Sequence, residues 1–403
     1  MRRLRGLLYS ILALTATAIE ASRLSAQDTT RTRPDTTKPA VDTQPAPPQP
    51  PPAPALPFEF SGVLYANYQY GGTKGNRAVN RFEVERAYLN FRATPGEHFA
   101  IRVTTDVYQQ RDTTRDQYYR GWAIRLKYAY AQYDFIRGIG DELKANVRLG
   151  MLHTVVIDHE EQFWNRGLAQ VAIEQNGFFS SSDLGAATTF TFPKKYGELY
   201  ATITNGPGYT SREVDRFKDY AARLTLTPLA NTFGFWKGLT ISPWYYNGDR
   251  ASDFARRRGT VQPVPTALRR DRAGVFLGLR DPRITLGAQF AQRWDVFESA
   301  DTTSDVVPTA VEQTGRVVSL YTIVRPLTYI NSAPNWPLAI VLRADEIKPN
   351  TDADPYYRNY IAGLSWEFNR RTSFTFDYQN QTPKDRSSAP DSKVYFLHVI
   401  AGF

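Results

Sequence analysis

From residue 58 onward the chain alternates between apolar and polar side chains with a period of two residues. In FEFSGVLYANYQY, residues 58–70, the even positions are mostly aromatic or aliphatic and the odd positions are largely polar. The same alternation returns in LKANVRLGML (143–152), NYIAGLSWEF (359–368) and VYFLHVIAGF (394–403). A period of two places alternate side chains on opposite faces of a strand, so the pattern predicts an all-β chain.

Sixteen segments with this pattern can be counted. The links between them alternate between short ones, such as TPGE (94–97) and NRRT (369–372), and longer polar ones, such as 110–120 and 299–312. An even number of strands with short turns at one end and long loops at the other is typical of an antiparallel outer-membrane barrel. Stacked sandwiches or a propeller would require several cores or blade repeats, which the sequence does not show. The predicted strands are 58–70, 79–93, 97–109, 121–136 (with a bulge near Tyr130), 141–152, 184–193, 197–206, 217–228, 238–248, 272–281, 283–298, 313–325, 336–347, 356–370, 373–381 and 392–403.

The dimensions and the last residue agree with a membrane barrel. Phe60 and Tyr70 are ten residues apart, which is about 33 Å along a strand and about 25 Å of height at a tilt of roughly 40°. In the last strand, Tyr395 and Phe403 share the apolar phase. A terminal phenylalanine on the lipid face of a closing strand is the signal that we expect barrel-assembly machinery to read.

Two segments precede the barrel. Residues 1–27 carry Arg2, Arg3 and Arg5 before an apolar stretch too short to span a bilayer, and this predicts a secretory signal peptide cleaved after Ala26 or Gln27. An uncleaved anchor is the alternative. Residues 28–57 are rich in Thr, Asp and Pro, and we interpret them as an extended periplasmic linker. A ligand for a Pro-binding domain is the other interpretation of this segment.

Composition restricts the chemistry. Cysteine is absent and only four histidines occur, so we expect no disulfide, no thiolate nucleophile, no cofactor and no metal site. Without residues 1–27 the formal net charge falls from +9 to +6. The basic residues do not alternate with stacking aromatics as nucleic-acid grooves require, so nucleic acid is not an expected partner.

Charged residues inside the predicted strands fall mostly at the phase opposite the apolar residues. A lysine or arginine facing lipid near the midplane costs roughly 2–4 kcal/mol, and five arginines would cost up to about 20 kcal/mol, which exceeds the stability of a typical domain. These charges either pair across the lumen or leave a basic surplus whose field a narrow passage focuses. The predicted pore lining contains Arg102, Arg125, Lys127, Lys144, Arg148, Arg223 and Arg343, with Asp106, Asp345, Glu367 and Asp377 as acids.

The longest link, residues 153–183, is too apolar for a solvated loop. A sixteen-stranded barrel has a lumen that wall side chains do not fill, so we expect this link to fold inward and narrow the pore. A metal site is a weaker alternative, because no spacing such as H-E-x-x-H occurs, and an amphipathic turn over 158–166 is the preferred interpretation. The candidate constriction residues are His153, Asp158, His159, Glu160, Glu161 and Arg166.

A second conspicuous link, residues 249–272, is rich in arginine. It is predicted to be extracellular, where it would either bind lipopolysaccharide phosphates or gather anions over the pore. Its candidate residues are Arg256, Arg257, Arg258, Arg269 and Arg270.

The segments FEFSGVLYANYQY and FEVERAYLNFRA (82–93), together with LKANVRLGML followed by its long link, resemble the phosphate-selective porin O/P family of Gram-negative outer-membrane channels. The resemblance spans about residues 58–403. It implies a sixteen-stranded pore, commonly trimeric, whose third extracellular loop folds inward and whose basic residues serve anions. The chain departs from the phosphate-selective type because residues 153–183 hold only Arg166 as a fixed cation and no lysine cluster.

Two classes of function follow from these observations. The first is a passive diffusion channel for small hydrophilic solutes, with anions, phosphate among them, preferred. The second is a barrel enzyme or a transporter of hydrophobic substrates. An esterase-type barrel would need a serine, a histidine and an orienting polar group together on one outer face, whereas His398 falls in the inner phase of the last strand. A hydrophobic-substrate transporter would need an N-terminal plug, and residues 28–57 are too polar and proline-rich to form one. We therefore favour the channel.

Overall fold

A computed structural model of the chain describes a single antiparallel sheet that closes on itself. Each strand pairs with its neighbours in the sequence, and β1 pairs with β16. The described residues form sixteen strands, as predicted. The structure describes residues 58–403 except 77, 110–120, 139–141, 252–266, 299–309, 330–336, 352–355, 370 and 384–390.

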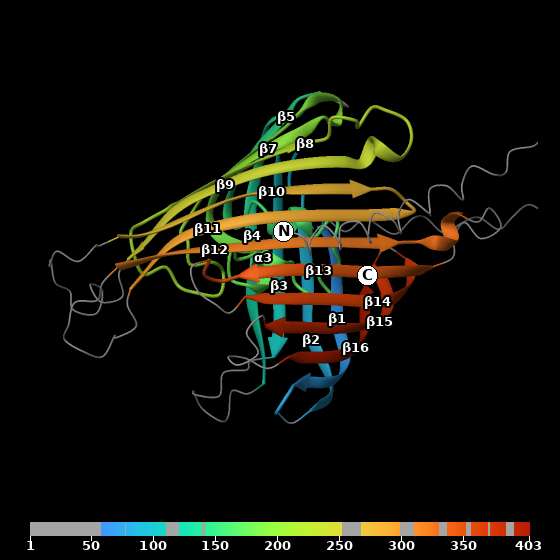
Figure 1. Cartoon of the computed structure of the whole chain (residues 1–403). Coiled ribbons are helices and arrows are strands. Elements are labelled where there is room, and N and C mark those ends of the chain that lie inside the picture. The colour runs from blue at the N-terminus through green and yellow to red at the C-terminus, as the bar shows by residue number, and fades with distance from the viewer. Residues whose placement is uncertain are drawn as a thin grey trace, which may run out of the picture.

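Figure 1 shows β9 to β15 crossing the nearer side of the barrel, with β2 to β4 running behind them. The bounds are β1 Phe58–Thr73, β2 Val79–Ala93, β3 Phe99–Gln109, β4 Trp122–Ile136, β5 Lys144–His153, β6 Ser182–Thr191, β7 Gly197–Thr204, β8 Asp219–Leu226, β9 Leu239–Ala251, β10 Ala267–Arg280, β11 Ile284–Glu298, β12 Ala310–Val324, β13 Leu338–Lys348, β14 Tyr357–Asn369, β15 Thr372–Pro383 and β16 Ser392–Gly402.

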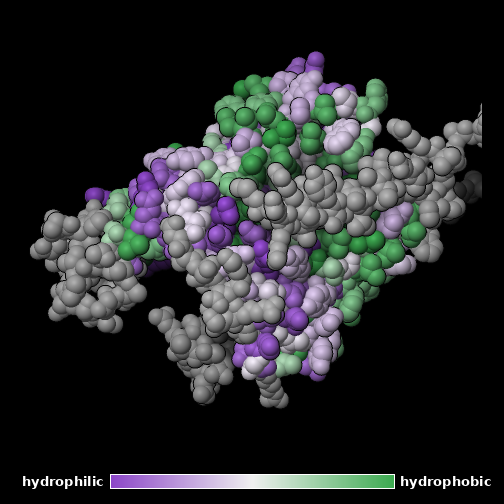
Figure 2. All heavy atoms as spheres, viewed as in Figure 1, coloured by the Kyte–Doolittle hydropathy of each residue, from purple (hydrophilic) through white to green (hydrophobic). Residues whose placement is uncertain are grey.

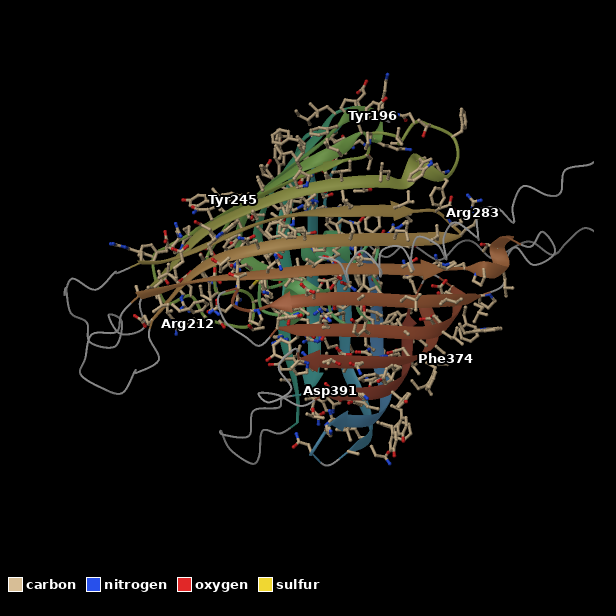
Figure 3. All side chains as sticks on the ribbon, viewed as in Figure 1. Tyr196, Arg212, Tyr245, Arg283, Phe374 and Asp391 are labelled. Atoms are coloured by element: carbon tan, nitrogen blue, oxygen red, sulfur yellow. The ribbon has the colours of Figure 1, made fainter. Side chains whose placement is uncertain are left out.

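The two ends of the barrel differ, as the lengths of the links predicted. Arg283 lies in the short turn between β10 and β11, and Arg212 lies in the longer link between β7 and β8; Figure 3 shows the two at opposite ends. β1 begins and β16 ends at the short-turn end. We call the other end the long-loop end.

Phe403 takes part in the closing seam between β1 and β16. The backbone amides of Gly62 and Phe403 each donate to the other's carbonyl, at 3.2 and 3.0 Å. The Phe403 ring lies 5.5 Å from that of Phe60 and is 61 % exposed on the outer face. A Cβ on Gly62 would come within 2.6 Å of the Phe403 ring, so a larger residue at position 62 would displace that ring.

Large apolar side chains cover the outside of the wall. Phe82, Ile124 and Leu149 are among the most exposed residues of the described chain, and Figure 3 shows Tyr245 and Phe374 pointing away from the barrel. Figure 2 shows apolar residues gathered toward the short-turn end and polar residues toward the long-loop end of the visible face. An exposed apolar exterior with buried polar residues behind it is the distribution expected of a wall that faces lipid. None of the described helices is long and apolar enough to cross a membrane.

Some local predictions need correction. The pairing of β3 with β4 shifts between Thr104 and Thr105, opposite Lys127, so this bulge precedes the predicted position at Tyr130, and a second shift lies between Asp134 and Ile136. The link predicted at 249–272 is shorter, because β9 extends to Ala251 and β10 begins at Ala267. The arginine-rich ends of β9 and β10 were therefore wrongly assigned to the loop.

Candidate pore and its constriction

The link between β5 and β6, residues 154–181, contains two short helices, α2 Ile157–Glu160 and α3 Ala172–Gln175. Its apolar side chains are buried, as their number predicted. The Phe163 ring lies 5.0 Å from Phe276 of β10, and the Trp164 ring lies 5.1 Å from Tyr321 of β12. These contacts are with inward-facing side chains.

Hydrogen bonds connect the same link to strands around the ring. Arg343 Nη1 of β13 donates to the Gln170 carbonyl at 2.7 Å, and Gln379 Nε2 of β15 donates to the Leu168 carbonyl at 3.0 Å. Arg223 of β8 donates to the carbonyl of Val155. Because one segment reaches β8, β13 and β15, we infer that it crosses the interior of the barrel.

Arg166 holds the link in shape. Its Nη1 donates to both Glu161 and Glu174, and the arginine side chain is buried. Two carboxylates therefore compensate the one fixed cation that the sequence placed at the constriction. Arg166 is a structural clamp and does not present a free charge to solutes.

The remaining candidates of this link fall into two groups. His153 accepts from Arg102 Nη1 at 3.0 Å through Nε2, and its Nδ1 lies 3.0 Å from Asp158 Oδ1. His159 Nε2 lies 2.9 Å from Ser242 Oγ, and burial together with Arg223 lowers the pKa of His159 to about 3, so this ring is neutral. Glu160 is fully buried, and neither carboxylate oxygen has a partner among the described residues.

The inner wall over β3 to β5 carries three cations that form no ion pair with a described carboxylate. Besides its bond to His153, Arg102 donates through Nε to Thr104 Oγ1 at 3.1 Å. Lys127 Nζ donates to Tyr88 Oη at 3.2 Å, and Arg148 Nε donates to Gln132 Oε1 at 2.7 Å. Rings of Tyr128, Tyr88 and Tyr130 lie beside these cations.

The other predicted lumenal arginines form ion pairs with neighbours on the wall. Arg223 pairs with Glu198, and Arg343 Nε lies 2.9 Å from Asp345 Oδ1. Arg125 shares Asp106 with Arg86, which the sequence analysis did not select. Arg223 and Arg343 therefore pair with neighbours on the same part of the wall and not across the lumen.

The other basic candidates do not line a narrow passage. Lys144 is exposed at the start of β5, at the short-turn end. Arg269 and Arg270 lie within β10 and not in a loop: Arg269 pairs with Asp271 and Glu312, and Arg270 pairs with Asp219. Arg256, Arg257 and Arg258 fall outside the described residues.

A second link, between β7 and β8, also contributes to the interior, and the sequence analysis missed it. Tyr209 lies within hydrogen-bonding distance of Arg86 and Arg125, 3.3 and 3.1 Å from its hydroxyl. The Tyr209 amide donates to the Ser182 carbonyl at 3.0 Å. The glycines around Tyr209 in NGPGY were the available signal, because Gly206 and Gly208 have positive φ and a Cβ on either would come within 2.6 Å of a neighbouring side chain.

A cavity of about 1350 Å³ opens at the short-turn end, beyond the constriction. Residues 161–166 of the inward link border it, together with the ends of β1, β10, β12 and β16. The candidate pore therefore has a wide chamber on the short-turn side, with the link as its inner limit.

Catalytic and metal arrangements find little support among the described residues. His398 Nε2 lies 3.0 Å from Asp377 Oδ2, so the histidine does have a carboxylate neighbour, which the sequence did not reveal. The nearby hydroxyl of Thr375 donates instead to Ser365. The described residues contain no group of three or more His, Asp or Glu that could hold a metal ion.

Comparison with known proteins gives matches only at the level of structure. No family model matches the chain, and no curated protein matches its sequence. Salmonella typhi OmpF superposes with a TM-score of 0.58 at 13 % identity, covering 86 % of this chain and 97 % of that one. An anion-selective porin from Comamonas acidovorans gives 0.58 at 10 % identity, covering 86 % and 99 %. The chain has the fold of an outer-membrane porin.

Pseudomonas putida OprB is a further match, with a TM-score of 0.56 at 10 % identity over 86 % of this chain and 94 % of that one. Identities this low show the fold alone. The membership of the phosphate-selective porin O/P family that the sequence suggested finds no support in these matches, although the porin architecture is confirmed.

Proposed function

We propose that this protein is a porin of a Gram-negative outer membrane, that small hydrophilic solutes cross it by passive diffusion, and that it favours anions. One observation carries the preference. Arg102, Lys127 and Arg148 stand on the inner wall without a paired carboxylate among the described residues, on the side where the link bearing Asp158 approaches.

The electrostatic field of these three cations depends on the acids near them. Asp158 is 45 % exposed, interacts electrostatically with Arg102 and Lys127, and has its Oδ1 atom 3.0 Å from His153 Nδ1. One acid that is already engaged by a histidine does not balance three cations, so a positive surplus remains. Walls of low dielectric concentrate such a surplus in the aqueous passage.

The finer features of the proposal follow from the sequence. Residues 1–27 would direct export, residues 28–57 would form a periplasmic linker, and Phe403 would be read by the barrel-assembly machinery. Outer-membrane lipid and lipopolysaccharide would surround the wall. A homotrimer and a preference for phosphate over other anions are the remaining proposals that rest on the resemblance.

The reversal potential in a planar bilayer under a salt gradient tests the charge argument. The wild type should favour anions, and the double variant R102Q/R148Q should shift the potential toward cations. Arg269→Gln is the matched control, because Arg269 is on the outer face and half exposed. A cation-selective or non-conducting wild type would refute the proposal, and equal shifts in both variants would show that the selective charges lie elsewhere.

A further inference from the structure

Two arginines, on the strands that flank β3, share one carboxylate of β3 near the long-loop end of the inner wall. Arg86 of β2 places Nη1 2.7 Å from Asp106 Oδ2, and Arg125 of β4 places Nε 2.9 Å from the same oxygen. Asp106 is fully buried between them on β3. The trio therefore retains one positive charge.

A residue from another part of the chain completes the cluster. Tyr209, in the link between β7 and β8, lies with its ring centre 4.5 Å from the Arg125 guanidinium carbon, and Tyr108 lies on the guanidinium at 4.0 Å. The Tyr209 hydroxyl is 3.1 Å from Arg125 Nη2 and 3.3 Å from Arg86 Nη1. Two rings and a hydroxyl thus fix the plane of Arg125, which lowers the entropy lost when a ligand binds.

The guanidinium nitrogens of this cluster that are not engaged are available to a ligand. Arg86 Nη2 and Arg125 Nη1 have no partner among the described residues, and the two side chains are 18 % and 22 % exposed, whereas the carboxylate behind them is enclosed. Two guanidinium edges held side by side present N–H groups to more than one oxygen at once. Such a fork suits carboxylate, sulfate or phosphate groups better than a spherical halide.

We propose that Arg86, Arg125 and Tyr209 form an oxyanion-binding subsite on the long-loop side of the constriction, with Tyr209 as its positioning residue. The proposal rests on the channel function above and adds a place where an oxyanion pauses. Asp106 precedes the long-loop end of β3 and Arg102 lies nearer its short-turn end, so a solute entering from the long-loop end meets the subsite before it meets Arg102.

The test measures how dissolved oxyanions reduce chloride current through single channels in bilayers of phosphatidylcholine. Potassium phosphate, sulfate and acetate are added separately to a fixed concentration of potassium chloride. Wild type should show saturable block by the oxyanions. Because the bilayer contains no lipopolysaccharide, block by phosphate arises from the dissolved ion and not from a lipid headgroup.

Tyr209→Phe removes the hydroxyl and keeps the ring, and it should weaken block about tenfold. Arg86→Gln should abolish it. The matched controls Tyr196→Phe and Arg269→Gln should leave block unchanged, because both side chains lie on the outside of the barrel. A circular-dichroism spectrum with the wild-type β-sheet signal in detergent shows that each variant has folded.

The two proposals fail in different ways. A cation-selective wild type contradicts the anion-favouring channel. An anion-selective wild type that shows no saturable block, or whose block is the same in Tyr209→Phe, overturns the subsite alone. Retained anion preference in Arg86→Gln together with lost block supports both, because Arg102, Lys127 and Arg148 are intact in that variant.

Discussion

Replacing Glu160 by glutamine should stabilise the protein at alkaline pH. Glu160 ends helix α2, is fully buried, and has no partner for either carboxylate oxygen among the described residues. Burial raises its pKa from 4.5 to about 8; Arg343 opposes the rise, and Asp345 and Glu161 add to it. The Tyr321 side chain of β12 lies beside the same group.

The sign and size follow from linkage. Between pH 4.5 and 8 the unfolded chain has lost this proton and the folded chain retains it, so the free energy of unfolding falls as pH rises. Each pH unit is worth about 1.4 kcal/mol, which gives up to about 5 kcal/mol above pH 8. Glu160→Gln removes this dependence, because an amide stays neutral.

Urea unfolding in detergent micelles, followed by tryptophan fluorescence at pH 5 and pH 9, measures the difference. The variant and the wild type should have similar midpoints at pH 5, and the variant should be the more stable at pH 9. Glu161→Gln is the control on the neighbouring residue: it breaks an ion pair with Arg166 and should destabilise at both pH values. A variant that is less stable than wild type at pH 9 would refute the reasoning.

Three further results are expected. Deleting residues 157–175 should raise single-channel conductance in planar bilayers, and an unchanged value would mean that the link does not narrow the pore. Trp164→Ala should lower the free energy of unfolding by about 3–5 kcal/mol, since the ring is buried against Tyr321; a loss below about 1 kcal/mol in urea unfolding would show that the ring is not tightly packed. Deleting Phe403 should lower the yield of assembled barrel in membranes while the conductance of assembled channels stays the same, because the ring lies on the outer face beside Phe60; altered conductance would contradict that placement.

The fold was predictable because strand periodicity is a local property. Every second residue faces the lipid, so the apolar phase identifies strands without knowledge of their partners. Bulges limit this reasoning. The pairing of β1 with β2 shifts between Tyr65 and Ala66, which leaves Glu85 of β2 as an extra residue without a partner in the register. The extra residue changes the phase of the strand between Glu83 and Arg86, so strict alternation does not predict the faces of both.

The sequence predicted which charged side chains face the pore but not which of them form ion pairs. Phase alone indicated that Arg102, Arg125 and Arg223 face inward, but whether a charge is free depends on cross-strand neighbours. Asp106 is directly opposite Arg125 in the register of β3 and β4, while Glu198 reaches Arg223 from the adjacent strand β7. Sequence distance gives no indication of which of these pairs form.

The burial of the link at 154–181 was predictable from its apolar content, and the contact of the link at 205–218 with Arg86 and Arg125 was not. Residues 205–218 are polar, and apart from the glycines of NGPGY nothing in their sequence distinguishes them from a solvated loop. Their position depends on single contacts, such as that of Gly208 against Ser180, which only the folded chain brings together. Tyr209 was therefore missed.

Gly167 places the link between β5 and β6 against the seam that closes the barrel. A Cβ there would come within 2.5 Å of Ile400 on β16 and 2.8 Å of Tyr65 on β1, the two strands that meet last along the chain. The same link also contacts β8, β10, β12 and β13, so the pairing of β1 with β16 completes a packing surface that the other strands already begin. Closing the wall and fixing the position of the link are therefore coupled.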